Sequence, residues 1–230
     1  MMDQKKFDDQ FHKFCQMCEA DGRFSPNVDQ VVAVLTEDKG KTEIYADWDY
    51  YLHTNWAARV LAKKKPKRHV DFGSFVYFSS ICSAFIPKFE FYDARPTGYA
   101  IPGLTDGPTD LTALAFPDGS IESISCLHVI EHIGLGRYGD KLDAKGDVRA
   151  AKELMRVLAP GGSLLFVAPM NLVPRVNFNA HRIYAPPHVA DLFGPLILDR
   201  LTVLSSGRIT STDGDIPQGD FTGCFEFSKP

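Results

Sequence analysis

One strand–helix–strand stretch constrains the fold of this chain more than any other part of it. The short apolar run 121–127 leads directly into His128, Glu131 and His132, and a glycine-rich loop follows. Further along, a Pro-Gly-Gly turn opens a second apolar run at 163–168. A strand with a polar tip, a helix and a turn into a buried strand are typical of the second half of an α/β domain of the nucleotide-binding type. Because such sheets hold ligands at the carboxyl ends of their strands, the three polar side chains are candidate site residues.

The composition of the chain favours a globular protein and excludes several classes of function. Its 230 residues are 44% hydrophobic and 23% charged, which suits one large α/β domain with a modest appendage. The net charge of −4 creates no field that attracts nucleic acid. No apolar run reaches the roughly 18 residues that a membrane span needs, and the N-terminus lacks the apolar core of a secretory signal. Five scattered cysteines argue against a disulfide framework, so we expect a cytoplasmic protein without membrane insertion.

Alternating strand and helix patterns predict a parallel sheet with helices on both faces. The predicted strands are 69–72, 88–92, 111–114, 121–127 and 163–168, and the predicted helices are 75–85, 145–158 and 187–193. Two closing runs, 198–205 and 223–228, predict an antiparallel pair at one sheet edge. Residues 1–68, which include a predicted helix at 47–62, are expected to form an N-terminal helical segment that covers the site. Residues 69–230 are expected to form the α/β domain.

Residues at the expected strand tips suit one ligand that extends along the sheet edge. Gly73, two residues after Asp71, lies where the first strand meets its helix, so that a ligand can approach the backbone closely. Asp93 ends the second expected strand and is well placed for ribose hydroxyls. Asp110 and Leu111 open the third expected strand and are placed to meet an adenine edge.

The motif series along the chain resembles that of a known family. HVDFGS, FYDARP, DLTALAFPDGSIESI, LHVIEH and LAPGGSLLFVAP are similar, in order, to the motifs of class I S-adenosylmethionine-dependent methyltransferases. The resemblance covers residues 69–230 and implies a Rossmann-like, doubly wound, seven-stranded sheet with an antiparallel last strand. It also implies that S-adenosyl-L-methionine binds through its methionine part to Asp71, Gly73 and Ser74, through its ribose to Asp93, and through its adenine to Asp110 and Leu111, with His128 facing the junction with the substrate.

The resemblance implies methyl transfer, and we expect O-methylation of a small polar acceptor such as a sugar or sugar nucleotide. The GLGRYGD insert and the segment 93–96 look closer still to a little-characterised methyltransferase-like subfamily, some members of which are associated with surface-glycan synthesis. Loops over the strand tips are where acceptor specificity is expected. The candidate acceptor contacts in these loops are Arg137, Tyr138, Asn177, His181 and Arg182.

Two alternative functions stay open. The first glycine-rich motif of the family has glycines at the positions of Phe75 and Tyr77, and bulky residues there narrow the loop. A non-catalytic methyltransferase-like binding or scaffold protein is therefore one alternative. A nicotinamide-dependent oxidoreductase is a lesser one, because the Gly-x-Gly-x-x-Gly turn is absent from the sequence.

The candidate catalytic residues His128, Glu131 and His132 have four interpretations. A zinc-protease helix is disfavoured, because the motif follows a strand and glycines follow it closely. With His181 as a further ligand, the three residues suit a divalent metal that polarises a substrate hydroxyl. Alternatively, they stabilise the loop through hydrogen bonds, or His128 acts as a general base without a metal.

Overall fold

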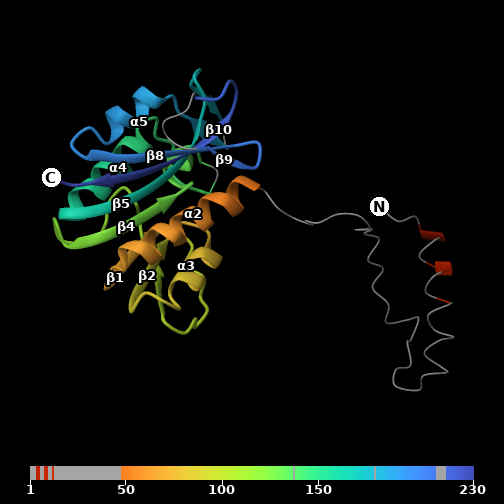
Figure 1. Ribbon diagram of the computed structural model, residues 1–230, viewed down its shortest axis with the longest axis horizontal. Helices are drawn as coiled ribbons and strands as arrows, with labels where there is room; N and C mark the ends of the chain where they lie inside the picture. The colour runs from red at the N-terminus through yellow and green to blue at the C-terminus, as the bar shows by residue number, and fades with distance from the viewer. Residues whose placement is uncertain are drawn as a thin grey trace. The chain divides into compact units, whose positions relative to one another are not determined.

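The computed structural model describes residues 4, 5, 8, 9, 12, 48–136, 138–178, 180–210 and 216–230 (Figure 1). The chain divides into two compact units, Met1–Ala46 and Asp47–Pro230. In the first unit the described residues are helical, and Gln4 donates a hydrogen bond to Asp8 at 2.9 Å. Most of the expected N-terminal helical segment lies outside the described residues, so its covering role stays a prediction. The helix expected at 47–62 belongs to the second unit.

The described residues of the second unit form a sheet of eight strands in the order β3-β2-β1-β4-β5-β10-β8-β9. The strands are β1 (Arg68–Phe72), β2 (Lys88–Asp93), β3 (Leu104–Pro108), β4 (Ile121–Leu127), β5 (Leu158–Met170), β8 (Ile197–Ser205), β9 (Arg208–Thr210) and β10 (Phe221–Ser228). Strands β1 to β5 pair in parallel, whereas β10 pairs antiparallel with both β5 and β8. This order confirms the predicted doubly wound sheet with its antiparallel last strand. The sequence did not predict the short strand β9, which extends β8 as a hairpin.

The predicted strand at 111–114 is wrong. The third strand is β3, which pairs in register with β2 from Phe89↔Leu104 to Asp93↔Pro108. Leu111 and Leu114 are buried in a turn instead, and the Leu114 N–H donates to Glu153 Oε2 at 2.7 Å. The apolar pattern therefore marked buried side chains correctly. The backbone N–H of Leu114, however, is hydrogen-bonded to a side chain of α4 (Gly146–Val157) and not to a neighbouring strand.

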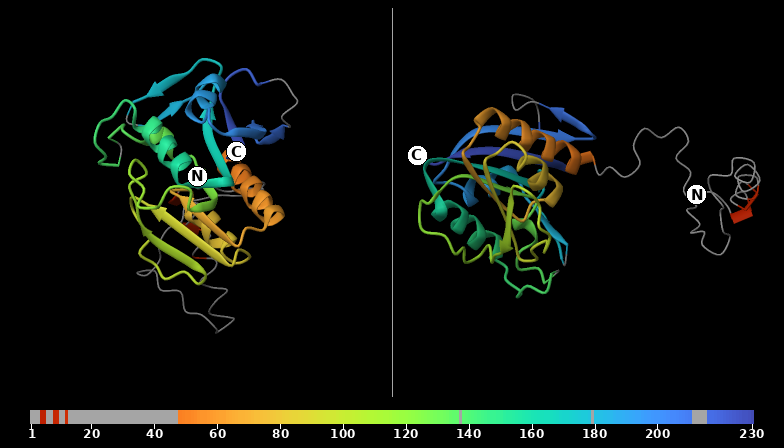
Figure 2. Two further views of the ribbon diagram at one scale, coloured as in Figure 1. Left: turned by 90° about the vertical axis from the view of Figure 1, so that its left-hand side faces the viewer. Right: turned by 90° about the horizontal axis from the view of Figure 1, so that it is seen from below.

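Helices cover both faces of the sheet (Figure 2). Helices α2 (Trp48–Lys64) and α3 (Val76–Cys82) pack on one face, and α4 (Gly146–Val157) and α5 (Pro186–Leu192) pack on the other. Alternate residues of β5 point to opposite faces, so one set joins each core. Leu165 and Val167 belong to the core with α2 and α3, whereas Leu164 and Phe166 belong to the core with α4 and α5.

Two short elements shape the carboxyl edge of the sheet. The 3-10 helix η2 (Ile130–His132) follows β4, and the two-stranded hairpin of β6 (Arg175–Asn177) and β7 (His181–Ile183) follows β5. Both elements lie beyond strand tips, which is where the sequence placed its candidate site. Among the described helices, none combines the length and the apolarity that crossing a membrane requires.

Candidate functional site

Asp71 lies at the tip of β1 inside a closed network of hydroxyl groups. Its Oδ1 accepts hydrogen bonds from Ser74 and Ser125, each at 2.5 Å, and its Oδ2 accepts one from Ser79 at 2.6 Å. The carboxyl group has no exposed surface, and this burial raises its pKa to about 6. The three hydroxyl donors lower the pKa, but burial outweighs them. Asp71 therefore orients the loop after β1 through Ser74, whose Oγ also accepts the Leu127 N–H at 3.1 Å.

His69 extends this network along β1. Its Nε2 lies 2.9 Å from Ser125 Oγ and its Nδ1 lies 2.7 Å from Ser123 Oγ. Because Ser125 gives its proton to Asp71, Nε2 is the donor, and Nδ1 then accepts from Ser123. Complete burial lowers the His69 pKa to about 3, so the ring is neutral. The sequence did not single out His69, although a polar residue within an apolar strand was the available signal.

Gly73 brings the tips of β1, β2 and β4 together. Its φ of +71° is a conformation that side chains disfavour, and its N–H donates to Tyr92 O at 2.9 Å. A Cβ there would lie 2.9 Å from Val129 Cγ1 and 3.3 Å from Asp93 Oδ2. The missing side chain thus lets the carboxylate of Asp93 approach the first strand tip. Asp93 Oδ1 also accepts the Arg95 N–H at 2.7 Å.

Asp110 and Leu111 begin the turn that replaces the predicted third strand. Asp110 Oδ1 accepts the N–H of Thr112 at 2.8 Å and its hydroxyl proton at 2.7 Å. Asp110 is exposed, whereas Leu111 is buried. The turn therefore presents a carboxylate beside an apolar side chain, as the sequence expected for an adenine contact, and that role stays a prediction.

His128 and Glu131 form a buried pair directly beyond β4. His128 has a φ of +58°, and its Nδ1 atom lies 2.9 Å from Glu131 Oε1. Strained backbone at a non-glycine residue is common at functional sites, where the surrounding structure holds it in place. Among the described residues, neither His128 Nε2 nor Glu131 Oε2 has a hydrogen-bond partner, although both atoms are buried. An ionised Glu131 accepts from Nδ1–H, which leaves the lone pair on Nε2.

Helix α2 places aromatic rings over His128. Tyr50 stacks on the His128 ring at a centroid distance of 5.2 Å, and His53 lies 4.8 Å from it. Phe75 packs edge-on against Tyr50 at 6.3 Å and against Tyr77 at 5.0 Å. Sequence reasoning missed Tyr50 and His53, because α2 reaches the site only through tertiary packing.

Phe75 and Tyr77 replace glycines without imposing an unfavourable backbone. Phe75 has a φ of −65° and a ψ of 122°, which any residue adopts. Its side chain is 49% exposed and that of Tyr77 is 66% exposed. The loop after β1 therefore follows a path that needs left-handed backbone at Gly73 alone, and the two rings lie largely in solvent.

The four candidate metal ligands do not form a metal-binding group. No set of three or more histidine, cysteine or acidic side chains lies close enough to hold an ion anywhere in the described part of the chain. His132 Nδ1 donates to Ala180 O at 2.6 Å, and its Nε2 lies 3.9 Å from Glu131 Oε1. The rings of His132 and His181 are 6.1 Å apart and perpendicular. The residues present thus do not fit the divalent metal that the sequence motif suggested.

The glycine-rich insert is held together by Asp140. Its two carboxylate oxygens accept the N–H groups of Gly134, Gly136 and Tyr138 at 2.6, 3.3 and 3.2 Å. Partial burial raises the Asp140 pKa, but these backbone donors outweigh it and lower the pKa below its usual range. Tyr138 packs under the guanidinium of Arg95 at 4.1 Å, which joins the insert to the loop after β2. The candidate Arg137 lies outside the described residues.

The structure separates the remaining acceptor candidates. Asn177 and His181 face each other across the β6–β7 hairpin, with Asn177 Nδ2 at 3.3 Å from His181 Nε2. Arg182 is buried and donates to the carbonyl oxygens of Ile133 at 2.6 Å and of Asp143 at 3.2 Å. This geometry gives Arg182 a positioning role, because its guanidinium holds the backbone that follows η2.

A small cavity of about 190 Å³ adjoins the His128 ring. Pro169 and Met170 from the end of β5, His181 and Ile183 from β7, and Phe221 and Thr222 from β10 converge on it. The polar residues of its lining are Tyr50, His128, His181, Asp220 and Thr222. The cavity therefore offers hydrogen-bonding groups beside the buried His128–Glu131 pair.

Comparisons with known proteins bear on the fold of the chain. The family model described as "Caenorhabditis protein of unknown function, DUF268" matches residues 117–206. No curated protein matches the chain. The N-methyltransferase NodS from Bradyrhizobium japonicum, in complex with S-adenosyl-L-homocysteine, is 14% identical, with a TM-score of 0.59 over 85% of this chain and 93% of NodS. The YcgJ protein of Bacillus subtilis is 14% identical, with a TM-score of 0.55 over 78% of this chain and 98% of YcgJ.

This protein has the class I methyltransferase fold. The same fold occurs in the [4+2]-cyclase SpnF, which is 13% identical, with a TM-score of 0.58 over 76% of this chain and 81% of SpnF. A class I methyltransferase fold alone therefore does not decide the reaction, and the function has to be argued from the site.

Proposed function

We propose that this protein is an S-adenosylmethionine-dependent methyltransferase that methylates an oxygen atom of a small polar acceptor. The observation that carries the proposal is the buried His128 Nε2, which lacks a hydrogen-bond partner among the described residues beside a cavity at the carboxyl edge of the fold. Ligands of open α/β sheets bind at this edge. The bound S-adenosyl-L-homocysteine of the structurally similar NodS supports the choice of cofactor.

The residues present fit the cofactor at three points. Gly73 has no side chain of its own, and this brings the backbone at the tip of β1 close to Val129 and Asp93 at the sheet edge. Asp93, at the tip of β2, offers carboxylate oxygen to ribose hydroxyls beside that glycine. Asp110, exposed in the turn after β3 beside the buried Leu111, offers carboxylate oxygen to the adenine amino group. In this proposal Asp71 does not contact the cofactor directly, because its carboxylate accepts hydrogen bonds from Ser74, Ser79 and Ser125. It positions the loop that does.

Methyl transfer asks little of the protein beyond alignment and proton removal. S-adenosylmethionine supplies an activated methyl group on its sulfonium. The acceptor oxygen would form a bond to that methyl group as the bond between the methyl carbon and the sulfonium sulfur breaks. The hydroxyl proton of the acceptor would pass to His128 Nε2. Glu131 orients the ring and stabilises the imidazolium that results, because its Oε1 receives Nδ1–H. S-adenosylhomocysteine and the methyl ether leave as products.

The small cavity supports a small polar acceptor. His181, Asp220 and Thr222 bring nitrogen and oxygen atoms to a volume of about 190 Å³ beside His128. A sugar, free or as a sugar nucleotide, presents hydroxyl groups that such a lining can bind. Tyr138 and Asn177, in the loops at the same edge, extend the acceptor contacts in this proposal.

Calorimetric titration with S-adenosylmethionine and S-adenosylhomocysteine tests the cofactor assignment. We expect wild-type protein to bind both, and Asp93→Ala to weaken binding at least tenfold, because the variant loses the charged acceptor for two ribose hydroxyls. Glu122→Ala is the matched control, since Glu122 is an exposed acid near the opposite end of β4. Unchanged affinity in Asp93→Ala, with unfolding as in wild type, would contradict the assignment.

A non-catalytic binding protein is the second candidate, and the substitution of two motif glycines by Phe75 and Tyr77 is the observation that favours it. The two proposals share cofactor binding and differ in turnover. Formation of S-adenosylhomocysteine in the presence of sugar acceptors supports the enzyme. Tight binding with no turnover of any hydroxylated acceptor supports the binding protein.

A further inference from the structure

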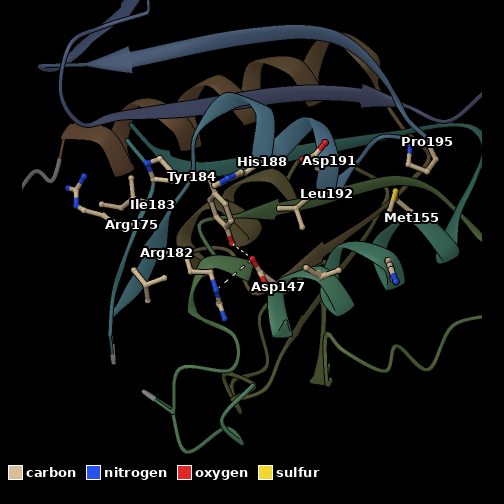
Figure 3. A pocket seen from close by; sticks show the side chains of 14 residues that line it. Asp147, Met155, Arg175, Arg182, Ile183, Tyr184, His188, Asp191, Leu192 and Pro195 are labelled. Atoms are coloured by element: carbon tan, nitrogen blue, oxygen red, sulfur yellow. Dashed lines mark hydrogen bonds and ion pairs between the residues drawn. The ribbon is translucent and has the colours of Figure 1, made fainter. Parts of the chain in front are cut away.

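A second and larger cavity lies between α4, α5 and the β6–β7 hairpin (Figure 3). Its volume is about 840 Å³, which is in the range of sites that bind small organic molecules. Ile183 lines this cavity and also the small one beside His128, so the two spaces are neighbours. The proposed methyl transfer uses the small cavity and leaves this larger one without a role.

Two polar side chains of the larger cavity, Tyr184 and Arg182, point toward Asp147 (Figure 3). Tyr184 donates its hydroxyl proton to Asp147 Oδ2 at 3.1 Å, and Arg182 Nε lies 3.7 Å from the same oxygen. No described residue donates a hydrogen bond to Asp147 Oδ1. Within the described part of the chain, the cavity therefore contains a carboxylate oxygen whose lone pairs are left for a ligand, while the other oxygen is held in place.

The rest of the lining decides the class of ligand. Apolar side chains make most of the wall: Val148, Met155, Val176, Ile183, Leu192 and two prolines. Charged side chains of both signs line the cavity, Asp147 and Asp191 beside Lys152, Arg175 and Arg182, so any charged ligand meets like charges as well as opposite ones. An uncharged hydroxyl avoids this repulsion and donates to Asp147 Oδ1.

We propose that this cavity binds a small molecule with a flat or branched apolar body and one uncharged hydroxyl group, with that hydroxyl donating to Asp147 Oδ1. The apolar body is removed from water against α4, α5 and the hairpin, which supplies most of the affinity. The hydroxyl supplies orientation, because a hydrogen bond to a charged acceptor is stronger than one between neutral groups. This site is distinct from the cofactor and acceptor sites and does not depend on them.

Calorimetric titration of the full chain with 2-naphthol and 2-methoxynaphthalene tests the proposal. The two probes share the same apolar body, but only 2-naphthol has a hydroxyl proton to donate. We expect saturable binding of 2-naphthol and roughly tenfold weaker binding of the methyl ether. Naphthalene-2-carboxylate should bind more weakly than 2-naphthol as well. Absence of saturable 2-naphthol binding, or equal affinity for all three probes, overturns the proposal.

A pair of tryptophan variants locates the binding. Met155 is a half-buried residue of α4 that lines the cavity. Met155→Trp fills part of the cavity and should weaken the binding of 2-naphthol at least tenfold. Ile209→Trp adds the same ring on β9, at a half-exposed position outside the cavity, and should leave the affinity unchanged. Equal affinity of the two variants would place the binding elsewhere and overturn the proposal. Circular dichroism of both variants confirms their folding, and the wild-type probe series needs no variant at all.

Discussion

The tips of β1 and β4 lie side by side at one edge of the sheet, and each holds a buried carboxylate near a histidine. In the β1 centre, Asp71 accepts three hydroxyl protons and both ring nitrogens of His69 have serine partners. In the β4 centre, His128 and Glu131 have one contact with each other and one buried atom each that no described residue satisfies. The two centres contain the same chemical groups and differ in how many of their hydrogen bonds are made.

In the proposed mechanism, this difference separates a structural centre at β1 from a reactive one at β4. A fully satisfied buried network fixes one conformation of the chain, and removing a partner costs stability. Buried polar atoms without partners cost stability as they stand, and they persist where a ligand or a substrate completes them. We therefore expect changes at β1 to alter the free energy of unfolding, and changes at β4 to alter activity.

The largest expected effect is on methyl transfer. His128→Asn removes the ring that receives the acceptor proton and should lower the turnover rate by on the order of 10² or more. His132→Asn should lower the turnover rate much less, because His132 donates a hydrogen bond to Ala180 O and is not the proton acceptor in the proposed mechanism. Initial rates of S-adenosylhomocysteine formation, with and without a chelator, measure both. Equal losses in the two variants, together with recovery on adding Mg²⁺, would instead support a metal site.

A second effect concerns the pH dependence of stability at the β1 centre. Burial raises the Asp71 pKa from 3.8 to about 6, so the folded state holds this proton more tightly than the unfolded state. The stability that protonated Asp71 contributes is complete below the unfolded pKa and is lost as the pH rises through about 6. Asp71→Asn cannot titrate. Its free energy of unfolding relative to wild type should therefore rise by about 3 kcal/mol between pH 3.5 and 7.

Urea denaturation of both proteins across this pH range measures that difference. His69 has the opposite influence, because burial lowers its pKa to about 3 and its contribution is lost as the pH falls. It is present in both proteins, so it largely cancels from the comparison. A difference that stays constant with pH would show that Asp71 is ionised in the folded state throughout.

The smallest expected effect distinguishes two neighbouring serines of α3. Ser79→Ala removes the one hydroxyl that donates to Asp71 Oδ2 and should lower the free energy of unfolding by about 2 kcal/mol at neutral pH. Ser80→Ala should change it by less than about 0.5 kcal/mol, because Ser80 is only half-buried and its hydroxyl makes no hydrogen bond with a described residue. Similar losses for the two variants would contradict a special role for the Asp71 network.

Most of the sheet followed from local patterns in the sequence. The strand at 121–127 has the bounds that were predicted, since its continuous apolar run ends sharply at His128. The strand at 111–114 was wrong, because Leu111 and Leu114 are apolar for a different reason, namely their burial in a turn. Periodicity reports burial, and it cannot distinguish a short buried turn from a short buried strand.

The candidate site was predictable only in part. Strand tips were found from sequence, because a parallel sheet aligns its carboxyl ends whatever the details of packing. Contacts between distant segments could not be predicted from the sequence. Tyr50 and His53, for example, lie over His128 because α2 packs across the sheet. The metal interpretation of the motif is not supported either, since the turn of η2 commits His132 Nδ1 to Ala180 O and no group of three candidate ligands forms among the described residues.

The sequence by itself determined the α/β class, the doubly wound sheet with its antiparallel last strand, and the edge at which a ligand would bind. These properties depend on local periodicity and chain order, which the sequence states directly. Only the tertiary structure decided which polar groups are satisfied. Asp71 and Glu131 are both acids near a strand tip, but three serines donate to one of them and one histidine is hydrogen-bonded to the other. That count depends on which segments meet in space, and it separates a carboxylate whose hydrogen bonds are made from one that keeps a buried oxygen without a described partner.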